Sequence, residues 1–149
     1  FELERVLRLN AQSHIIKASD ADIEWLYGLD VIAGLDDIAS EWSTGKLVVI
    51  TRGAEGVSLY RDGKRIDVAG QRVNLVDTVG AGDTFMANFL GELSQLDALG
   101  GNPPSRLARM SDDQLAGAAT VANAAAAIVC ERTGCQPPTL AETRSRTQG

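Results

Sequence analysis

Histidine and cysteine are scarce in this sequence of 149 residues, which holds one histidine and two cysteines. Ser-His-Asp and Cys-His catalysis each need a histidine base within reach of the nucleophile, so the single His14 argues against both. A structural zinc site needs about four ligands, whereas Cys130 and Cys135 stand five residues apart with no histidine near them. We expect both cysteines to be reduced packing residues.

Positive charge is also in the minority, since 14 Lys and Arg face 20 Asp and Glu, for a net charge of −6. Nucleic-acid binders neutralise phosphates with clustered basic residues, and the sequence has no basic run. We expect no membrane span, because no apolar stretch reaches the roughly 18 residues that one needs. The charged start, residues 1–5, is unlike a signal peptide. These absences indicate a cytoplasmic protein with no nucleic-acid or membrane partner.

What the sequence does contain is an apolar pattern that switches between the periods of helices and strands. Leu47–Thr51 is a continuous apolar run, typical of a buried central strand. Asp62-Gly63 between two alternating segments predicts a β-hairpin. We expect helices over residues 3–9, from 20 and over 35–42, and strands over 13–18, 47–51, 57–60 and 65–68.

The second half reads as a short strand over 74–77, a long helix over about 83–99 and a loop over 100–104. A capping box at Ser111–Gln114 then predicts a last helix that runs to about residue 130, before a polar tail. No internal repeat or linker interrupts this order, so the length and pattern predict one α/β unit.

The segment Asp77–Phe85 carries the clearest chemical signal. A strand here runs through Gly-Ala-Gly directly into a helix, so backbone N–H groups and the positive end of the helix dipole can bind an anion such as a phosphate. No Lys-Ser/Thr follows the glycines, so this is not a P-loop. The dinucleotide fingerprint fails as well, because Phe85 occupies the position of its third glycine.

Asp83 is a carboxylate at the mouth of this anion site. One interpretation is a helix cap, a role that Asp performs well. The other is a general base, which would take a proton from a hydroxyl that attacks a bound phosphoryl group. The residues alone leave both open.

The same segment, Asp77-Thr78-Val79-Gly80-Ala81-Gly82-Asp83-Thr84-Phe85, resembles the C-terminal signature of the ribokinase-like (PfkB) carbohydrate kinases. Upstream, Thr51-Arg52-Gly53-Ala54-Glu55-Gly56 resembles the Thr-x-Gly-x-x-Gly nucleotide loop of that family. Downstream, residues 122–127 followed by Gly134 resemble its adenine-side helix and closing loop. The resemblance spans nearly the whole chain.

The resemblance implies a three-layer α-β-α ribokinase-like fold. Such kinases are about twice as long, and this sequence starts without Met on a helical pattern. We therefore expect residues 1–149 to be the C-terminal, nucleotide-binding half, with the hairpin, and without the sugar-binding half and lid. We expect this part alone to be nearly inactive and the whole enzyme to be a homodimer.

The resemblance also implies roles for individual residues. Asp83 would be the catalytic base, and the anion hole would be formed by the amides of Gly80, Ala81 and Gly82. Thr51 and Gly53 would lie along the phosphates of ATP, and Asn123 beside the adenine. Gly56 fits the nucleotide loop and equally a turn that joins two strands. Arg52 fits a phosphate contact and equally an exposed ion pair.

Two carboxylates resemble cation sites of the family. Relatives often carry Asn-x-x-Glu near Mg²⁺ and its waters, where this chain has Ser19-Asp20-Ala21-Asp22. Asp22 would therefore act near magnesium through water, although a capping box explains the same residues. Asp77, with carbonyls near Val79 and the 130–139 loop, would match the place of a monovalent cation such as potassium.

The implied function is ATP- and Mg²⁺-dependent phosphorylation of a sugar. The sequence of Lys17–Asp22, together with Trp25-Leu26-Tyr27, is more similar to fructokinases than to ribokinases. Fructose is therefore the expected substrate and fructose 6-phosphate the expected product. The alternatives are a ribokinase, a 2-keto-3-deoxygluconate kinase, or a nucleotide-binding module without catalysis.

Overall fold

The computed structural model describes residues 1–28 and 31–149, with side chains 31–33 left out. Four strands form one mixed sheet in the order β1 (Ile15–Ser19), β2 (Leu47–Thr51), β3 (Gly56–Arg61) and β4 (Lys64–Ala69). β1 and β2 are parallel, whereas β2 with β3 and β3 with β4 are antiparallel. The predicted central strand is β2, which pairs on both sides.

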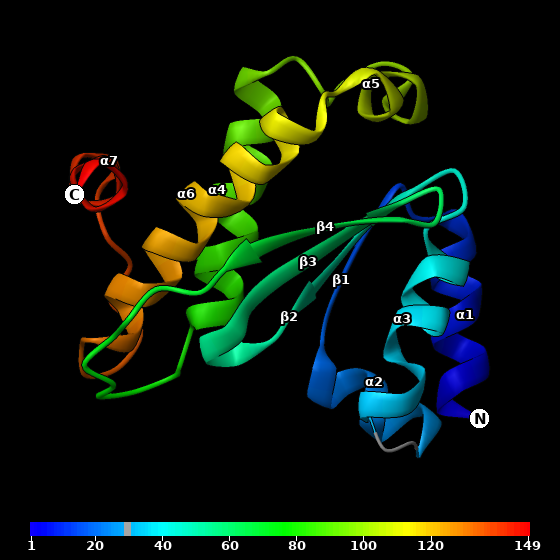
Figure 1. Cartoon of the computed structure of the whole chain (residues 1–149), viewed down its shortest axis with the longest axis horizontal. Coiled ribbons are helices and arrows are strands. Elements are labelled where there is room, and N and C mark those ends of the chain that lie inside the picture. The colour runs from blue at the N-terminus through cyan, green and yellow to red at the C-terminus, as the bar shows by residue number, and fades with distance from the viewer. Residues whose placement is uncertain (29–30) are drawn as a thin grey trace.

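Helices cover both faces of this sheet (Figure 1). One face carries α1 (Glu2–Gln12), α2 (Asp20–Tyr27) and α3 (Val31–Trp42), and the other carries α4 (Ala81–Gln95) and α6 (Asp112–Cys130). The remaining helical elements are the 3₁₀ turn η1 (Gly53–Glu55), α5 (Pro103–Arg109) and α7 (Leu140–Gln148). The expected layering of helix, sheet and helix is therefore present.

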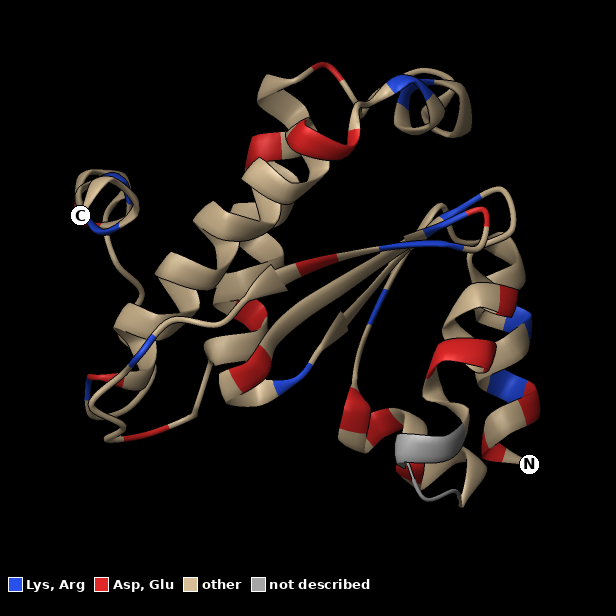
Figure 2. Ribbon diagram, viewed as in Figure 1, with Lys and Arg blue, Asp and Glu red and all other residues tan. Residues whose placement is uncertain are grey.

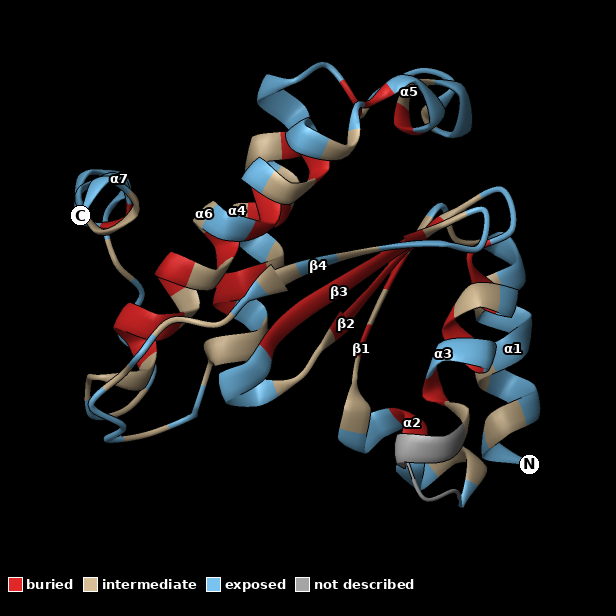
Figure 3. Cartoon of the chain, in the orientation of Figure 1, coloured by how far each residue is buried: buried red, intermediate tan, exposed pale blue. Residues whose placement is uncertain are grey.

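The sheet divides the buried apolar residues into two cores (Figure 3). Leu47 and Val49 of β2 face α4 and α6, while Val48 and Ile50 face α2 and α3. This is the period of two that a strand imposes on its side chains. All four side chains are fully buried, because helices cover β2 on both faces.

The hairpin follows the sequence prediction closely. Asp62 and Gly63 join β3 to β4 with φ angles of 48° and 79°. Two successive positive φ angles match the twist of paired strands and explain why Asp-Gly occupies this turn. The charged residues of β4 lie along this outer strand (Figure 2).

The structure contradicts the predicted strand over residues 74–77. The amides of Val76 and Asp77 donate instead to the carbonyl of Cys130, at 2.8 and 3.2 Å. The segment thus binds to the end of a helix and joins no sheet. Its apolar side chains Leu75 and Val76 remain 64% and 58% exposed, so the short apolar run did not mark a core strand.

The helices of the second half also differ from expectation. α4 covers 81–95 and not 83–99, because Asp97 adopts a left-handed conformation (φ 55°) and the amide of Ala98 donates to the carbonyl of Leu93. Residues 103–104, expected in a loop, open α5, where proline suits the first helical turn. The expected polar tail contains α7, which begins with a capping box between Thr139 and Glu142.

Of the helices in residues 1–28 and 31–149, α6 alone is long and apolar enough to span a membrane by length and composition, with a mean hydropathy of 1.2. The expectation that no stretch reaches that length is therefore wrong. Nine of its residues are buried, and the helix packs against α4, α7, β3 and β4. This is the pattern of a core helix.

Candidate active site

The predicted site residues gather at the carboxyl ends of β1 and β2. Ser19 pairs with Thr51 in the parallel register of these strands. The hydroxyl of Thr51 lies 3.5 Å from the carbonyl oxygen of Ala18. Thr51 shares the strand parity of Val49, so it stands on the sheet face that α4 covers.

The Gly80–Gly82 loop forms the N-terminus of α4. Gly80 is the N-cap residue with φ 81°, a conformation that favours glycine. The amide of Ala81 donates to the carbonyl of Thr78 at 3.2 Å, so it is already engaged. Within the described residues, the amides of Gly80, Gly82 and Asp83 donate to no backbone carbonyl, and Gly82 and Asp83 belong to the first turn of α4. Two N–H groups at a positive helix end therefore remain available for an anion.

Asp83 occupies the third position of α4, where a carboxylate can close a capping box. Such boxes are complete in α2, α6 and α7, where the third residue bonds back to the N-cap amide. The N-cap of α4 is a glycine with no side-chain hydrogen bond. Asp83 is exposed, and its carboxylate makes no hydrogen bond or ion pair with any residue of the described chain. The structure thus gives it no capping bond.

Lys17 is a residue of this site that the sequence analysis did not assign. A Cβ placed on Gly82 would lie 2.9 Å from the Lys17 Nζ, so the ammonium lies against the backbone of the Gly80–Gly82 loop. The alternation of β1 places Lys17 on the same face of the strand as Ile15. Ile15 packs against the core under α4 and α6, so Lys17 also faces these helices. That β1 faces α4, 65 residues later, is not visible in the sequence.

The loop is also braced from the C-terminal side. Asp77 accepts hydrogen bonds from the amides of Val79 and Gly134, both at 3.0 Å. These two amides lower the pKa of Asp77, which is thus an anion that ties two loops together. Beside it, Cys135 Sγ would lie 2.1 Å from a Cβ on Gly80. The thiol therefore covers the glycine that starts α4.

Cys130 and Cys135 are free thiols, as expected. Burial raises the pKa of Cys130, and the carboxylates of Asp77 and Glu131 raise it further. Cys130 is half-buried at the end of α6, whereas Cys135 is exposed.

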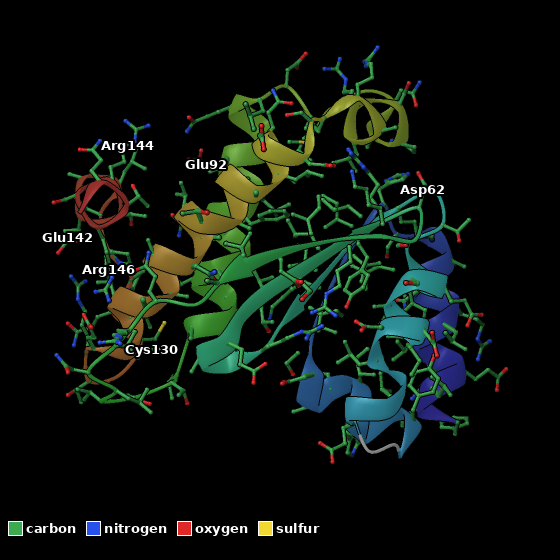
Figure 4. All side chains as sticks on the ribbon, viewed as in Figure 1. Asp62, Glu92, Cys130, Glu142, Arg144 and Arg146 are labelled. Carbon is green, nitrogen blue, oxygen red and sulfur yellow. The ribbon has the colours of Figure 1, made fainter. Side chains whose placement is uncertain are left out.

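Helix α7 fastens the same region (Figure 4). Arg146 forms an ion pair with Glu131 at 2.7 Å and also donates to the side chain of Gln71 and the carbonyl of Arg72. Glu131 in turn accepts from the amide of Asn74. The last helix thereby holds the segment that leads into Asp77, a role that the sequence analysis missed because it expected a polar tail.

Gly53 and Gly56, the two glycines of the predicted nucleotide loop, stand in different surroundings. A Cβ on Gly56 would lie 2.1 Å from the carbonyl oxygen of Val68, and its φ is 104°. The turn interpretation of Gly56 is therefore sufficient to explain the glycine. Gly53 has φ 53° and open space around it. Asn123 of α6 donates to the carbonyl of Ala69 at 3.3 Å, which places it beside the end of β4.

Arg52 forms an ion pair, the second of its two predicted roles. Its Nη2 lies 3.4 Å from Asp36 and 3.0 Å from the hydroxyl of Tyr60. Burial and the neighbouring Asp36 raise the pKa of Tyr60 to about 12. A cavity of about 730 Å³ adjoins Arg52, and four of its eight lining residues are carboxylates: Asp20, Glu24, Asp36 and Glu55. This excess of negative charge is unsuited to phosphate.

Asp22 completes the capping box of α2, since its Oδ2 accepts from the amide of Ser19 at 2.8 Å and its own amide donates to the Ser19 hydroxyl. Across the part of the chain that the structure describes, no group of three or more His, Cys, Asp or Glu side chains is arranged to hold a metal ion.

Comparison with known proteins places the chain in a family. Residues 2–142 match the family model described as pfkB family carbohydrate kinase. A fructokinase of Rhizobium leguminosarum bv. trifolii is 46% identical over 93 residues, which cover 61% of this chain and 28% of the relative.

Two solved structures share the fold. The aminoimidazole riboside kinase of Salmonella enterica, complexed with aminoimidazole riboside and an ATP analogue, is 23% identical with a TM-score of 0.78. The alignment covers 99% of this chain and 46% of that one. The fructokinase of Vibrio cholerae O395, bound to fructose, ADP and calcium, is 24% identical with a TM-score of 0.72, over 89% of this chain and 40% of that one.

These likenesses confirm the three-layer ribokinase-like fold, and the chain spans less than half the length of the relatives it matches. The family model covers nearly all of the chain, including the three motifs that suggested the resemblance. This chain belongs to the pfkB family of carbohydrate kinases.

Proposed function

We propose that this chain is the catalytic and nucleotide-binding part of an ATP-dependent sugar kinase. The observation that carries the proposal is the N-terminus of α4, where the exposed Asp83 makes no capping bond and stands beside two backbone amides with no acceptor. A carboxylate next to an anion-binding helix end can serve a reaction between a hydroxyl and a phosphoryl group.

In this proposal Asp83 takes the proton from the sugar hydroxyl as the hydroxyl oxygen attacks the γ-phosphorus of ATP. The amides of Gly82 and Asp83 hold the transferring group, with the positive end of the α4 dipole behind them. The amide of Ala81, predicted to share this role, is instead held by the carbonyl of Thr78. The amide of Gly80, also predicted to share it, donates to no acceptor in the described residues and stays part of the proposed anion site.

Nucleotide contacts are proposed at the edge of the sheet. Thr51 and Gly53 would border the phosphates, because Thr51 is at the end of β2 on the face of α4 and Gly53 has open space around it. Asn123 would lie beside the adenine, near the Gly56 turn. ATP is the proposed nucleotide.

The residues fit a loosely held magnesium ion. Mg²⁺ commonly keeps several waters and takes its other ligands from substrate phosphates and one or two carboxylates. Asp22 offers one exposed carboxylate at the end of β1 and would hold such an ion through water. When bound, the ion neutralises phosphate charge.

A potassium ion would use the carboxylate of Asp77, which contacts both the amide of Val79 and, in the 130–139 loop, the amide of Gly134. Oxygen donors of this kind suit hard cations. We propose it as an accessory site.

Fructose is the proposed sugar, supported by the 46% identity to a fructokinase over 93 residues. A ribokinase or a 2-keto-3-deoxygluconate kinase is the runner-up. Because the chain spans 28% to 46% of its relatives, we propose that the sugar is held mainly by a part of the enzyme outside these 149 residues.

The test is sugar-dependent ADP release by the longest chain that the gene encodes, measured over a panel of fructose, ribose and 2-keto-3-deoxygluconate. The proposal predicts turnover with fructose and little with the 149 residues alone, since positioning of both substrates supplies much of the catalysis. Turnover with another sugar would replace fructose and keep the kinase. ATP binding without turnover on any sugar would identify a nucleotide-binding module.

A further inference from the structure

We propose that Lys17 is a catalytic residue whose ammonium binds the transferred phosphoryl group together with the amides of Gly82 and Asp83. This inference rests on the proposed kinase function and deepens it. It assigns the cationic side chain of the site to β1.

The geometry of β1 directs the Lys17 side chain toward the N-terminus of α4. Lys17 pairs with Val49 in the parallel register of β1 and β2, and Val49 is in the core under α4 and α6. Its chain neighbours Ile16 and Ala18 are in the core on the other face. The Lys17 side chain therefore emerges on the α4 face, where its Nζ lies 2.9 Å from the Cβ position of Gly82.

The partners of the other lysines make Lys17 distinctive. The sequence contains three lysines. Lys46 Nζ donates to the carbonyls of Asn10 and Ser13, and Lys64 forms an ion pair with Asp112. For Lys17, the structure of residues 1–28 and 31–149 gives no hydrogen bond and no ion pair. Its half-buried ammonium has no protein oxygen that explains its position.

Electrostatics makes that position unfavourable without a ligand. The N-terminus of a helix carries about half a positive charge and favours anions. Lys17 adds a full positive charge beside it, while Asp83 lies beyond ion-pair distance of the ammonium. An ammonium and two amides without acceptors thus lie together at the N-terminus of α4. An anion between them would satisfy all three.

The geometry points to the transferred phosphoryl group as that anion. Its oxygens, when held by the amides of Gly82 and Asp83, would be within reach of the Lys17 Nζ, which lies against Gly82. In the step, the sugar oxygen forms a bond to the γ-phosphorus, and the bond from that phosphorus to the bridging oxygen of ADP breaks. The sugar proton goes to Asp83. Lys17 keeps its protons and balances the charge that builds on the transferring group.

The same contact explains why residue 82 is a glycine. A side chain at this position would meet the ammonium, because the nearest atom to a Cβ at residue 82 would be the Lys17 Nζ. Glycine therefore lets the cation approach the helix end closely.

The experiment compares Lys17→Met and Lys17→Arg in the longest chain that the gene encodes, with Lys64→Met as a matched control far from the site. Mg-ATP and Mg-ADP binding is measured by calorimetry, and sugar-dependent ADP release is measured in parallel. We expect Lys17→Met to lower kcat and weaken Mg-ATP binding by about 10- to 100-fold, because a hydrogen bond between charged groups is lost. Mg-ADP, which lacks the transferred group, should bind unchanged, and Lys17→Arg should recover part of the loss.

A thermal melt separates this role from a structural one. We expect Lys17→Met to keep or raise Tm, since it removes a positive charge from the positive end of α4. Equal Mg-ATP binding by wild type and Lys17→Met would overturn the proposal, and so would a lowered Tm with equal losses for Mg-ATP and Mg-ADP.

The outcomes also separate this proposal from the kinase function. If no sugar is phosphorylated but Mg-ATP binds and Lys17→Met weakens that binding, the kinase function fails and Lys17 stands as a phosphate-binding residue. If sugar is phosphorylated and Lys17→Met is fully active, the proposed role of Lys17 is wrong and the kinase function stands. If Mg-ATP does not bind to the wild-type chain, both proposals fail.

Discussion

Asp83 shows how one position in a helix can serve either structure or chemistry. In α2, α6 and α7 the third helical residue is Asp22, Gln114 or Glu142, and each returns a bond to its N-cap amide. Asp83 has the same position and no such bond, and its N-cap Gly80 is left-handed (φ 81°), whereas the N-caps of the other three helices are extended. The comparison within one chain therefore favours a chemical role for this carboxylate.

Gly80 gives a prediction about stability. Gly80→Ala should lower the free energy of unfolding by about 1–2 kcal/mol for the left-handed backbone alone, and further because the new methyl group meets Cys135 Sγ. The matched control is Gly91→Ala, in the exposed middle of α4 with open space, which should raise stability by about 1 kcal/mol. Urea denaturation followed by circular dichroism measures both. Equal effects of the two variants would contradict the proposed constraint.

The sequence predicted the site residues that lie within one motif and missed those that meet across the fold. Asp83 and the Gly80–Gly82 loop are contiguous, so a strand, a turn and a helix start were enough to single them out. Lys17 lies 65 residues from Gly82, and Cys135 lies 55 residues from Gly80. Their contacts depend on how β1, α4 and α6 pack, which no local pattern contains.

Helices α4 and α6 pack closely because their facing residues are small or aromatic. Ala118, Ala119 and Ala122 of α6 are buried in the same core as Phe85 and Phe89 of α4. The two phenyl rings stack with centroids 5.8 Å apart. The alanine-rich stretch thus lets one helix backbone approach the other, which fixes α4 and the site at its N-terminus.

Ala122→Leu should therefore overpack this interface. Ala122 is fully buried, so we expect a loss of about 1–3 kcal/mol in the free energy of unfolding. Thr120→Leu, on the exposed side of the same helix, is the control and should change stability little. Chemical denaturation of both variants tests this, and a tolerated Ala122→Leu would show that the interface is loosely packed.

Elements with strong local signals were predicted and those set by neighbours were not. The hairpin came from Asp62-Gly63, and the capping boxes of α2 and α6 came from their own residues. Residues 74–77 look apolar enough for a strand, but their hydrogen-bond partner is the end of α6. Helix α7 is polar, and ion pairs such as Arg146–Glu131 and Arg132–Glu142 hold it.

Across the molecule, a polar network crosses from α3 to the sheet. The hydroxyl of buried Tyr60 donates to Asp36 at 2.5 Å, and Arg65 forms an ion pair with the same carboxylate at 2.7 Å. The network joins β3 and β4 to the α3 layer. Its stability depends on the protonated state of Tyr60.

The pH dependence of stability follows from this. Folding raises the pKa of Tyr60 from 10.0 to about 12, so the folded state holds a proton that the unfolded state loses. The stabilising contribution is complete below pH 10 and is lost as pH rises toward 12. Tyr60→Phe should remove this contribution to the alkaline decline and lower stability at pH 7 by about 1 kcal/mol, since a hydrogen bond is lost. Urea titrations between pH 7 and 11 measure it, and an unchanged alkaline slope in Tyr60→Phe would contradict the assignment.

The whole chain brings its site together at one end of the sheet, where β1 and β2 end and α4 begins. Composition and periodicity predicted the α/β class, and three motifs predicted the family. The location in the cytoplasm, the homodimer and the assignment of residues 1–149 to one half of the enzyme stay predictions.

The most direct test of the central claim is the turnover of Asp83→Asn in the longest chain that the gene encodes, assayed as sugar-dependent ADP release. Loss of the general base should reduce kcat by about 10²–10⁴-fold. Mg-ATP binding and Tm should be nearly unchanged, because the Asp83 side chain makes no capping bond in the structure. Near-normal kcat in Asp83→Asn would contradict the role of Asp83 as the base and, with it, the proposed mechanism.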